Sequence, residues 1–92
     1  MCPVIEDEEH LKLINYQHNQ IRSIQNLDQM RNLIFLDLYD NQIERINGLN
    51  NLVTLRVLML GKNKIQKIEN INHLIYLDIL DLHGNQVIYL NI

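Results

Sequence analysis

The sequence repeats one pattern of apolar residues and asparagine every 22 residues. The units begin at Leu11, Leu33, Leu55 and Leu77, each reads approximately LxxLxLxxNxIxxIxxLxxL, and the fourth is incomplete. Leu, Ile and Asn make up 16, 14 and 13 of the 92 residues, because these three types fill the repeated positions. A period of this length indicates that each unit is one small element that buries its apolar side by stacking on the next unit.

The spacing inside a unit predicts its shape. Leu36 and Leu38 alternate with Asp37, as in a short strand with one buried face. From Ile43 onward, apolar residues recur at every third position, which suits tight turns better than an α-helix. We therefore predict an α/β solenoid with about four parallel strands on its concave face and 3₁₀ or irregular turns on its convex side. The expected strands are 13–17, 35–39, 57–61 and 79–83.

An asparagine occupies the same place in every unit, just after the predicted strand. There the chain turns inward and leaves backbone N–H and C=O groups without partners in the sheet. An asparagine amide has both donors and an acceptor, so stacked asparagines can satisfy these groups from one turn to the next. We expect a structural ladder made of Asn19, Asn41, Asn63 and Asn85.

These motifs resemble the leucine-rich repeat (LRR) family in its short 22-residue class, over residues 11–90. Segments 14–19, 36–43, 60–63 and 80–86 look like LRR subunits of tubulin polyglutamylase complexes. That resemblance implies a non-catalytic scaffold that binds a protein partner, with subunits of a tubulin-modifying or ciliary complex as the expected partners. Two alternatives stay open: a regulatory or targeting subunit of a protein phosphatase, and a component of a nuclear RNA-processing complex.

The side chains that point away from the core of the predicted strands are the candidate binding residues. Their first row is entirely apolar, and an aligned apolar row on an exposed sheet is typical of a contact surface. Aromatic and arginine side chains are the strongest anchors in such surfaces. The candidate partner-binding residues are Leu13, Phe35, Asp37, Tyr39, Arg56, Val57, Met59, Ile79, Asp81 and His83. Asp40 and Lys62 belong to the expected rim.

The residues do not favour catalysis or metal binding. Asp37 and Asp81 are expected about 9–10 Å apart on an open sheet, which is too far for a retaining glycosidase and offers no desolvated pocket. His18 and His83 are three repeats apart, beyond the reach of one metal ion. We therefore expect no catalytic residue, no metal and no cofactor.

Charge and composition narrow the partners and the compartment. The formal charge is −3, but outside the acidic run at 6–9 the chain has eight Lys and Arg against seven Asp and Glu. A nearly neutral body argues against nucleic acid as a direct partner. Apolar runs of only a few residues argue against a membrane span. A single cysteine and an acidic start favour the cytoplasm, including the cytoskeleton or the cilium, with the nucleus as an open alternative.

The two ends of a repeat array need protection from water. We expect residues 1–10 to form an acidic flank or partial cap, and residues 11–92 to form the four repeats. Nothing in the sequence caps the last repeat, so we also expect end-to-end self-association through it.

Overall fold

The computed structural model describes residues 11–90, which form six short strands joined by turns. Each of the four repeats contributes one strand of three residues to the main sheet. These strands are β1 (Leu13–Asn15), β2 (Phe35–Asp37), β3 (Val57–Met59) and β5 (Ile79–Asp81). A second sheet has two strands, β4 (Lys67–Ile68) and β6 (Tyr89–Leu90).

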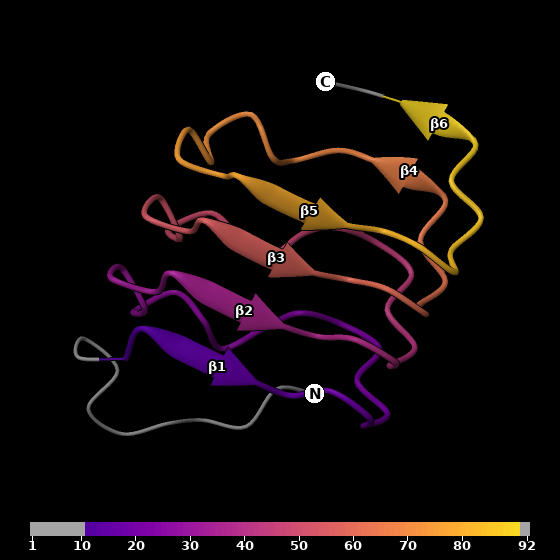
Figure 1. Ribbon diagram of the computed structural model, residues 1–92, viewed down its shortest axis with the longest axis horizontal. Helices are drawn as coiled ribbons and strands as arrows, with labels where there is room; N and C mark the ends of the chain where they lie inside the picture. The colour runs from indigo at the N-terminus through magenta and orange to yellow at the C-terminus, as the bar shows by residue number, and fades with distance from the viewer. Residues whose placement is uncertain (1–10, 91–92) are drawn as a thin grey trace.

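The main sheet is parallel, and its register equals the period of the sequence. Its order is β1-β2-β3-β5, with Leu13 opposite Phe35, Phe35 opposite Val57, and Val57 opposite Ile79. Figure 1 shows the four arrows side by side and pointing the same way. The predicted parallel sheet of about four strands is confirmed. Equivalent side chains of successive repeats therefore lie in rows across the sheet.

The strands begin where predicted but end two residues earlier. Each chain segment bends away after its third strand residue, and a residue with positive φ follows soon afterwards. Hydrogen bonds between neighbouring turns nevertheless continue past the strands: Tyr16 N–H donates to Asp37 O (2.8 Å), and His18 N–H to Tyr39 O (2.9 Å). Tyr39 and His83 thus lie just beyond the strands rather than inside them.

The return legs consist of consecutive β-turns. Met30 N–H donates to Leu27 O (3.1 Å), and Leu33 N–H donates to Met30 O (3.2 Å). The next two units repeat this arrangement at 49, 52 and 55 and at 71, 74 and 77. Because each bond joins residues three apart, the apolar residue at every third position returns to the inside. The label α/β was wrong for this part of the chain, because residues 11–90 contain no helix.

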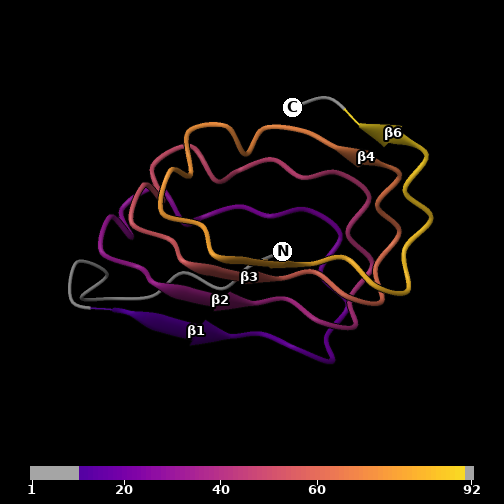
Figure 2. The ribbon, with the colours of Figure 1, turned by 45° about the horizontal axis from the view of Figure 1, so that its top comes forward.

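The core lies between the main sheet and the return legs (Figure 2). The middle residues of β2 and β3, Leu36 and Leu58, are completely buried, as are Leu33 and Leu55 on the return side. Leu80, the equivalent residue of β5, is only partly buried. Residues 1–10, where we predict the partial cap, lie outside the described residues. Within the described part, no helix is long and apolar enough to cross a membrane.

Candidate functional site on the sheet face

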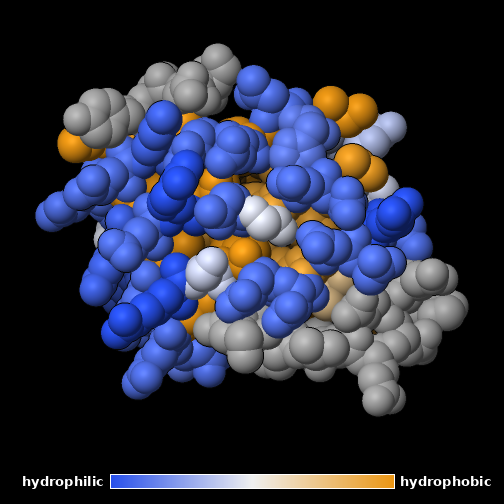
Figure 3. Space-filling view, turned by 180° about the vertical axis from the view of Figure 1, so that it is seen from behind, coloured by the Kyte–Doolittle hydropathy of each residue, from blue (hydrophilic) through white to orange (hydrophobic). Residues whose placement is uncertain are grey.

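The side of the main sheet that points away from the core carries three rows of side chains, which together we call the sheet face. Its first row is Leu13, Phe35, Val57 and Ile79, as predicted. Leu13 and Ile79 are 59% and 52% exposed, whereas Phe35 and Val57 are half-buried between them. Figure 3, which views the opposite side of the molecule, shows mainly hydrophilic side chains with hydrophobic ones visible between them.

The second row consists of the last residue of each strand: Asn15, Asp37, Met59 and Asp81. Three of these side chains accept a hydrogen bond from the backbone. Asn15 Oδ1 accepts the Gln17 amide at 3.1 Å, and Asp37 Oδ1 accepts the Tyr39 amide at 3.0 Å. Asp81 makes the same bond to the His83 amide at 3.0 Å. An asparagine or aspartate side chain that binds the backbone two residues later stabilises a turn. Asn15, Asp37 and Asp81 therefore stabilise the turns that follow their strands. The two aspartates also give this edge of the sheet negative charge.

The surroundings of Asp81 change the pKa of its carboxyl group. Its carboxylate accepts the backbone amide of His83, and its two oxygens also lie 2.7 and 3.0 Å from Nδ1 of the His83 ring. The backbone bond first, then the ring bond and the charge of His83, hold the pKa of Asp81 below its ordinary value, although partial burial opposes them. Asp81 is therefore ionised throughout the neutral range.

The third row, just beyond the strands, is Gln17, Tyr39, Gly61 and His83, and its Tyr39 ring contacts both the His83 ring and the ring of His18, which follows this row by one residue. The His18 ring meets the edge of Tyr39 with 5.7 Å between centroids, and Tyr39 lies 5.5 Å from His83 at an angle of 31°. The ammonium of Lys62 lies 5.6 Å from the Tyr39 centroid. We call His18, Tyr39 and His83 the ring cluster. It spans all four repeats and borders the second row.

Gly61 makes the contact between two of these rings possible. It stands in the repeat between Tyr39 and His83, and a Cβ there would lie 2.9 Å from Tyr39 Cδ1 and 2.7 Å from His83 Cε1. Those separations are shorter than real Cβ atoms tolerate. The absence of a side chain at Gly61 therefore lets the rings approach each other across a whole repeat.

Two ion pairs flank the sheet face. Arg56, immediately before β3, binds Asp78 through Nε (2.9 Å) and a terminal nitrogen (2.5 Å). His18 Nδ1 lies 2.8 Å from Asp40 Oδ2. All four side chains are at least half exposed, so neither pair adds much stability. Arg56 is thus held at the start of the strands by its neighbour rather than extended over the sheet.

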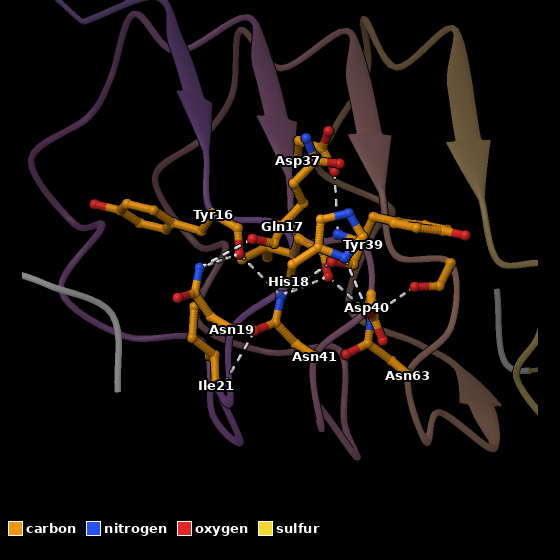
Figure 4. Close-up of polar contacts among 12 residues, drawn as sticks. Tyr16, Gln17, His18, Asn19, Ile21, Asp37, Tyr39, Asp40, Asn41 and Asn63 are labelled. Atoms are coloured by element: carbon orange, nitrogen blue, oxygen red, sulfur yellow. Dashed lines mark hydrogen bonds and ion pairs between the residues drawn. The ribbon is translucent and has the colours of Figure 1, made fainter.

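Figure 4 shows Asn41 and Asn63 of the asparagine ladder close to His18 and Tyr39 of the ring cluster. Asn63 Nδ2 donates to Leu38 O of the previous turn (3.0 Å) and to Leu60 O of its own turn (3.1 Å), while its Oδ1 accepts the Ile43 amide (3.0 Å). Asn41 bonds in the same way to Tyr16, Leu38 and Ile21, and Asn85 to Leu60, Leu82 and Ile65. Each of these asparagines ties one turn to the turn before it.

Asn19 differs from the other three. It is exposed and donates only to Tyr16 O and Gln17 O of its own turn. Asn41 and Asn63 are 7% and 8% exposed. Asn19 therefore does not link two turns as the predicted ladder requires, because the described residues contain no turn before it to bond.

The structure adds residues that the sequence interpretation left out of the binding set. His18 and Gly61 were not among the candidates, yet both shape the ring cluster. Aligning the repeats shows Gln17, Tyr39, Gly61 and His83 in one column, and a glycine between two rings in that column was the available signal. Among residues 11–90, no group of three or more His, Cys, Asp or Glu side chains could hold a metal ion.

A parallel sheet with one strand per 22-residue turn, closed by β-turns and an asparagine ladder, is compatible with a leucine-rich repeat fold. No protein-family profile matches the chain. The human leucine-rich repeat-containing protein 49 is 60% identical over 39 residues, which are 42% of this chain and 6% of that protein. The mouse protein of the same name is 62% identical over 35 residues, 38% of this chain and 5% of that protein. The chain thus matches only a small part of these relatives, and their names support the repeat assignment.

Proposed function

We propose that the chain is a non-catalytic interaction module that holds a protein partner on its sheet face. The observation that carries this proposal is the in-register apolar row, in which Leu13 and Ile79 are more than half exposed. Exposing such side chains in a continuous row is unfavourable unless another surface covers them. The similarity to proteins named for leucine-rich repeats also favours an interaction scaffold.

The ring cluster supplies anchors beside this row. Tyr39 combines a large contact area with few rotatable bonds, and aromatic side chains dominate the affinity of many interfaces. The core and the asparagine ladder hold the rows in place, so the surface is organised before a partner arrives. Little conformational entropy is then lost on binding.

As partners we propose subunits of a tubulin polyglutamylase or related ciliary complex, on the strength of the sequence resemblance. A protein phosphatase, for which the chain would be a regulatory subunit, and a nuclear RNA-processing complex are the second candidates. Cytoplasmic residence at the cytoskeleton or cilium, with no direct contact to nucleic acid or membrane, is part of the same proposal. So is end-to-end self-association through the last repeat.

Binding of the purified chain to reconstituted candidate complexes tests the proposal. Phe35→Ala and Tyr39→Ala remove the central apolar contact and the central ring of the sheet face, and each should weaken binding at least tenfold. The matched control is Tyr76→Ala, because Tyr76 is 59% exposed on a turn of the return leg. It should leave binding unchanged.

The identity of the complex and the use of the sheet face are separate outcomes. Selective loss of the polyglutamylase subunits, of the phosphatase or of the ribonucleoprotein proteins identifies which partner depends on the sheet face. If both sheet-face variants bind every partner as well as the Tyr76→Ala control does, then the sheet face is not the binding surface.

A further inference from the structure

We propose that the partner segment on the sheet face is cationic as well as apolar. An arginine or lysine side chain of the partner lies against Tyr39, beside the carboxylates of Asp37 and Asp81, while a neighbouring apolar side chain covers Phe35 and Val57. This inference rests on the proposed function, because it describes what the same surface recognises.

The first argument for a cationic partner is the negative charge of the second row. Asp37 and Asp81 lie on either side of Met59, in register with it, and are about 9–10 Å apart. This row contains no positively charged side chain. The low pKa of Asp81 keeps its carboxylate charged. An approaching anion would meet two aspartates here, whereas a cation over Met59 would be attracted by both.

The neighbouring basic side chains leave the carboxylate of Asp37 without an ion partner among the described residues. Arg56 lies at the start of the strands and binds Asp78. At the other end of the strands, the ring of His18 lies against Asp40 and the ring of His83 against Asp81, and each ring carries a charge only when it is protonated. Lys62 is the remaining cation beside the ring cluster, and its side chain is exposed. A flexible lysine can move aside at little cost.

The ring cluster also favours a cationic side chain of the partner. Lys62 Nζ lies 5.6 Å from the Tyr39 centroid, so this ring already attracts an ammonium group within the chain. The contacts of Tyr39 with His18 and His83 extend the aromatic surface next to the carboxylates. A guanidinium group stacks on aromatic faces and binds carboxylates at its edge, so arginine fits this combination best.

Substitutions by asparagine separate charge from structure at this site. Asn15 occupies the equivalent position in β1 and accepts the backbone amide two residues later, as Asp37 and Asp81 do. The double variant Asp37→Asn, Asp81→Asn should therefore keep both turns and lose only the two charges. Asp28→Asn is the matched control, because Asp28 is exposed on a turn of the return leg.

The experiment is an NMR titration of the ¹⁵N-labelled chain with two pentapeptides that have leucine at alternate positions. One peptide has arginine and the other has glutamate at the remaining positions. The arginine peptide should shift the amide signals of Asp37, Tyr39 and Met59, and the glutamate peptide should not. The double variant should weaken the arginine peptide about tenfold, with a smaller dependence on salt, and the Asp28→Asn control should bind like the original chain.

Equal binding of the two peptides, or undiminished binding of the arginine peptide by the double variant, would overturn the cationic partner. The reconstituted complex of the preceding section distinguishes this failure from that of the proposed function. If Phe35→Ala abolishes complex formation and the double variant does not affect it, the sheet face is the docking surface but its partner is not cationic. If neither change affects complex formation, both proposals are wrong.

Discussion

The rings of Tyr39 and His83 lie 5.5 Å apart across Gly61, although a whole repeat separates the two residues. The contact joins the second and fourth turns directly. It exists because the intervening turn has no side chain at that position. The ring cluster therefore depends on a residue that contributes no ring and no charge.

Gly61→Ala should separate these rings and cost little stability. The atoms that a Cβ would meet belong to the rings of Tyr39 and His83 rather than to the backbone, and these rings can rotate away. We expect the free energy of unfolding to fall by less than about 1 kcal/mol. Urea unfolding measures this change, and NMR measures the loss of contact between the two rings. An intact ring contact in this variant would contradict the role given to Gly61.

Gly48→Ala should behave in the opposite way. Gly48 has a φ of +76°, and a Cβ there would lie directly against the backbone carbonyl of Ile24. Backbone atoms cannot rotate away, and alanine disfavours this φ. We expect a loss of about 2–3 kcal/mol in the free energy of unfolding, measured with urea. A loss no larger than that of Gly61→Ala would mean that the turns are less tightly stacked than described.

Asn63→Ala should be among the most damaging polar substitutions. Asn63 is 8% exposed, donates to three carbonyl groups and accepts the Ile43 amide. Removing its amide leaves several buried backbone groups unpaired, so we expect a loss of about 3 kcal/mol. Asn19→Ala is the control, with an expected loss below about 1 kcal/mol, since Asn19 is exposed and bonds only within its turn. Equal losses in urea unfolding would refute the ladder as a link between turns.

Most of the fold could be predicted from the 22-residue repeat. The alternation at Leu36 and Leu38 predicted a strand. The 22-residue period predicted that Phe35 lies beside Val57, because equivalent residues of stacked repeats come into register. The apolar spacing of three residues predicted turns rather than an α-helix on the return leg, and hydrogen bonds between residues three apart, such as Met30 to Leu27, close it.

The candidate site was predictable only in part. The alternation of a strand placed the first and second rows of the sheet face outward. Beyond the strands, the direction of a side chain depends on single turn residues. His18, Asp40 and Lys62 all have positive φ at the same place in successive repeats, and no apolar pattern marks that place. The ring cluster and the role of Gly61 therefore depend on turn geometry that the sequence pattern does not show.

Acidification should remove a contribution of Asp81 to stability. The pKa of Asp81 is lower in the folded chain than its ordinary value of 3.8, chiefly because the His83 amide binds the charged form. A depressed pKa means that the contribution is present above about pH 4 and is lost as the pH falls through the folded value. We expect Asp81→Asn to be less stable than the original chain at pH 6, by less than about 1 kcal/mol, and the difference to shrink as the pH falls below 3.8.

Urea unfolding at several pH values checks this expectation. His83→Ala is an informative companion, because it removes the ring but keeps the backbone amide that is the larger cause of the shift. This variant should therefore lose only the smaller part of the pH dependence. A difference between Asp81→Asn and the original chain that grows as the pH falls below 3.8 would show that the sign is wrong.

The central claim is that a protein partner covers the sheet face, and hydroxyl-radical footprinting of the chain in a reconstituted complex tests it most directly. Tyr39 and Tyr76 provide a matched pair, one on the sheet face and one on a return-leg turn. Partner binding should reduce the oxidation of Phe35, Tyr39 and Met59 severalfold and leave Tyr76 unchanged. Protection of Tyr76, with Phe35, Tyr39 and Met59 as reactive as in the free chain, would contradict the account.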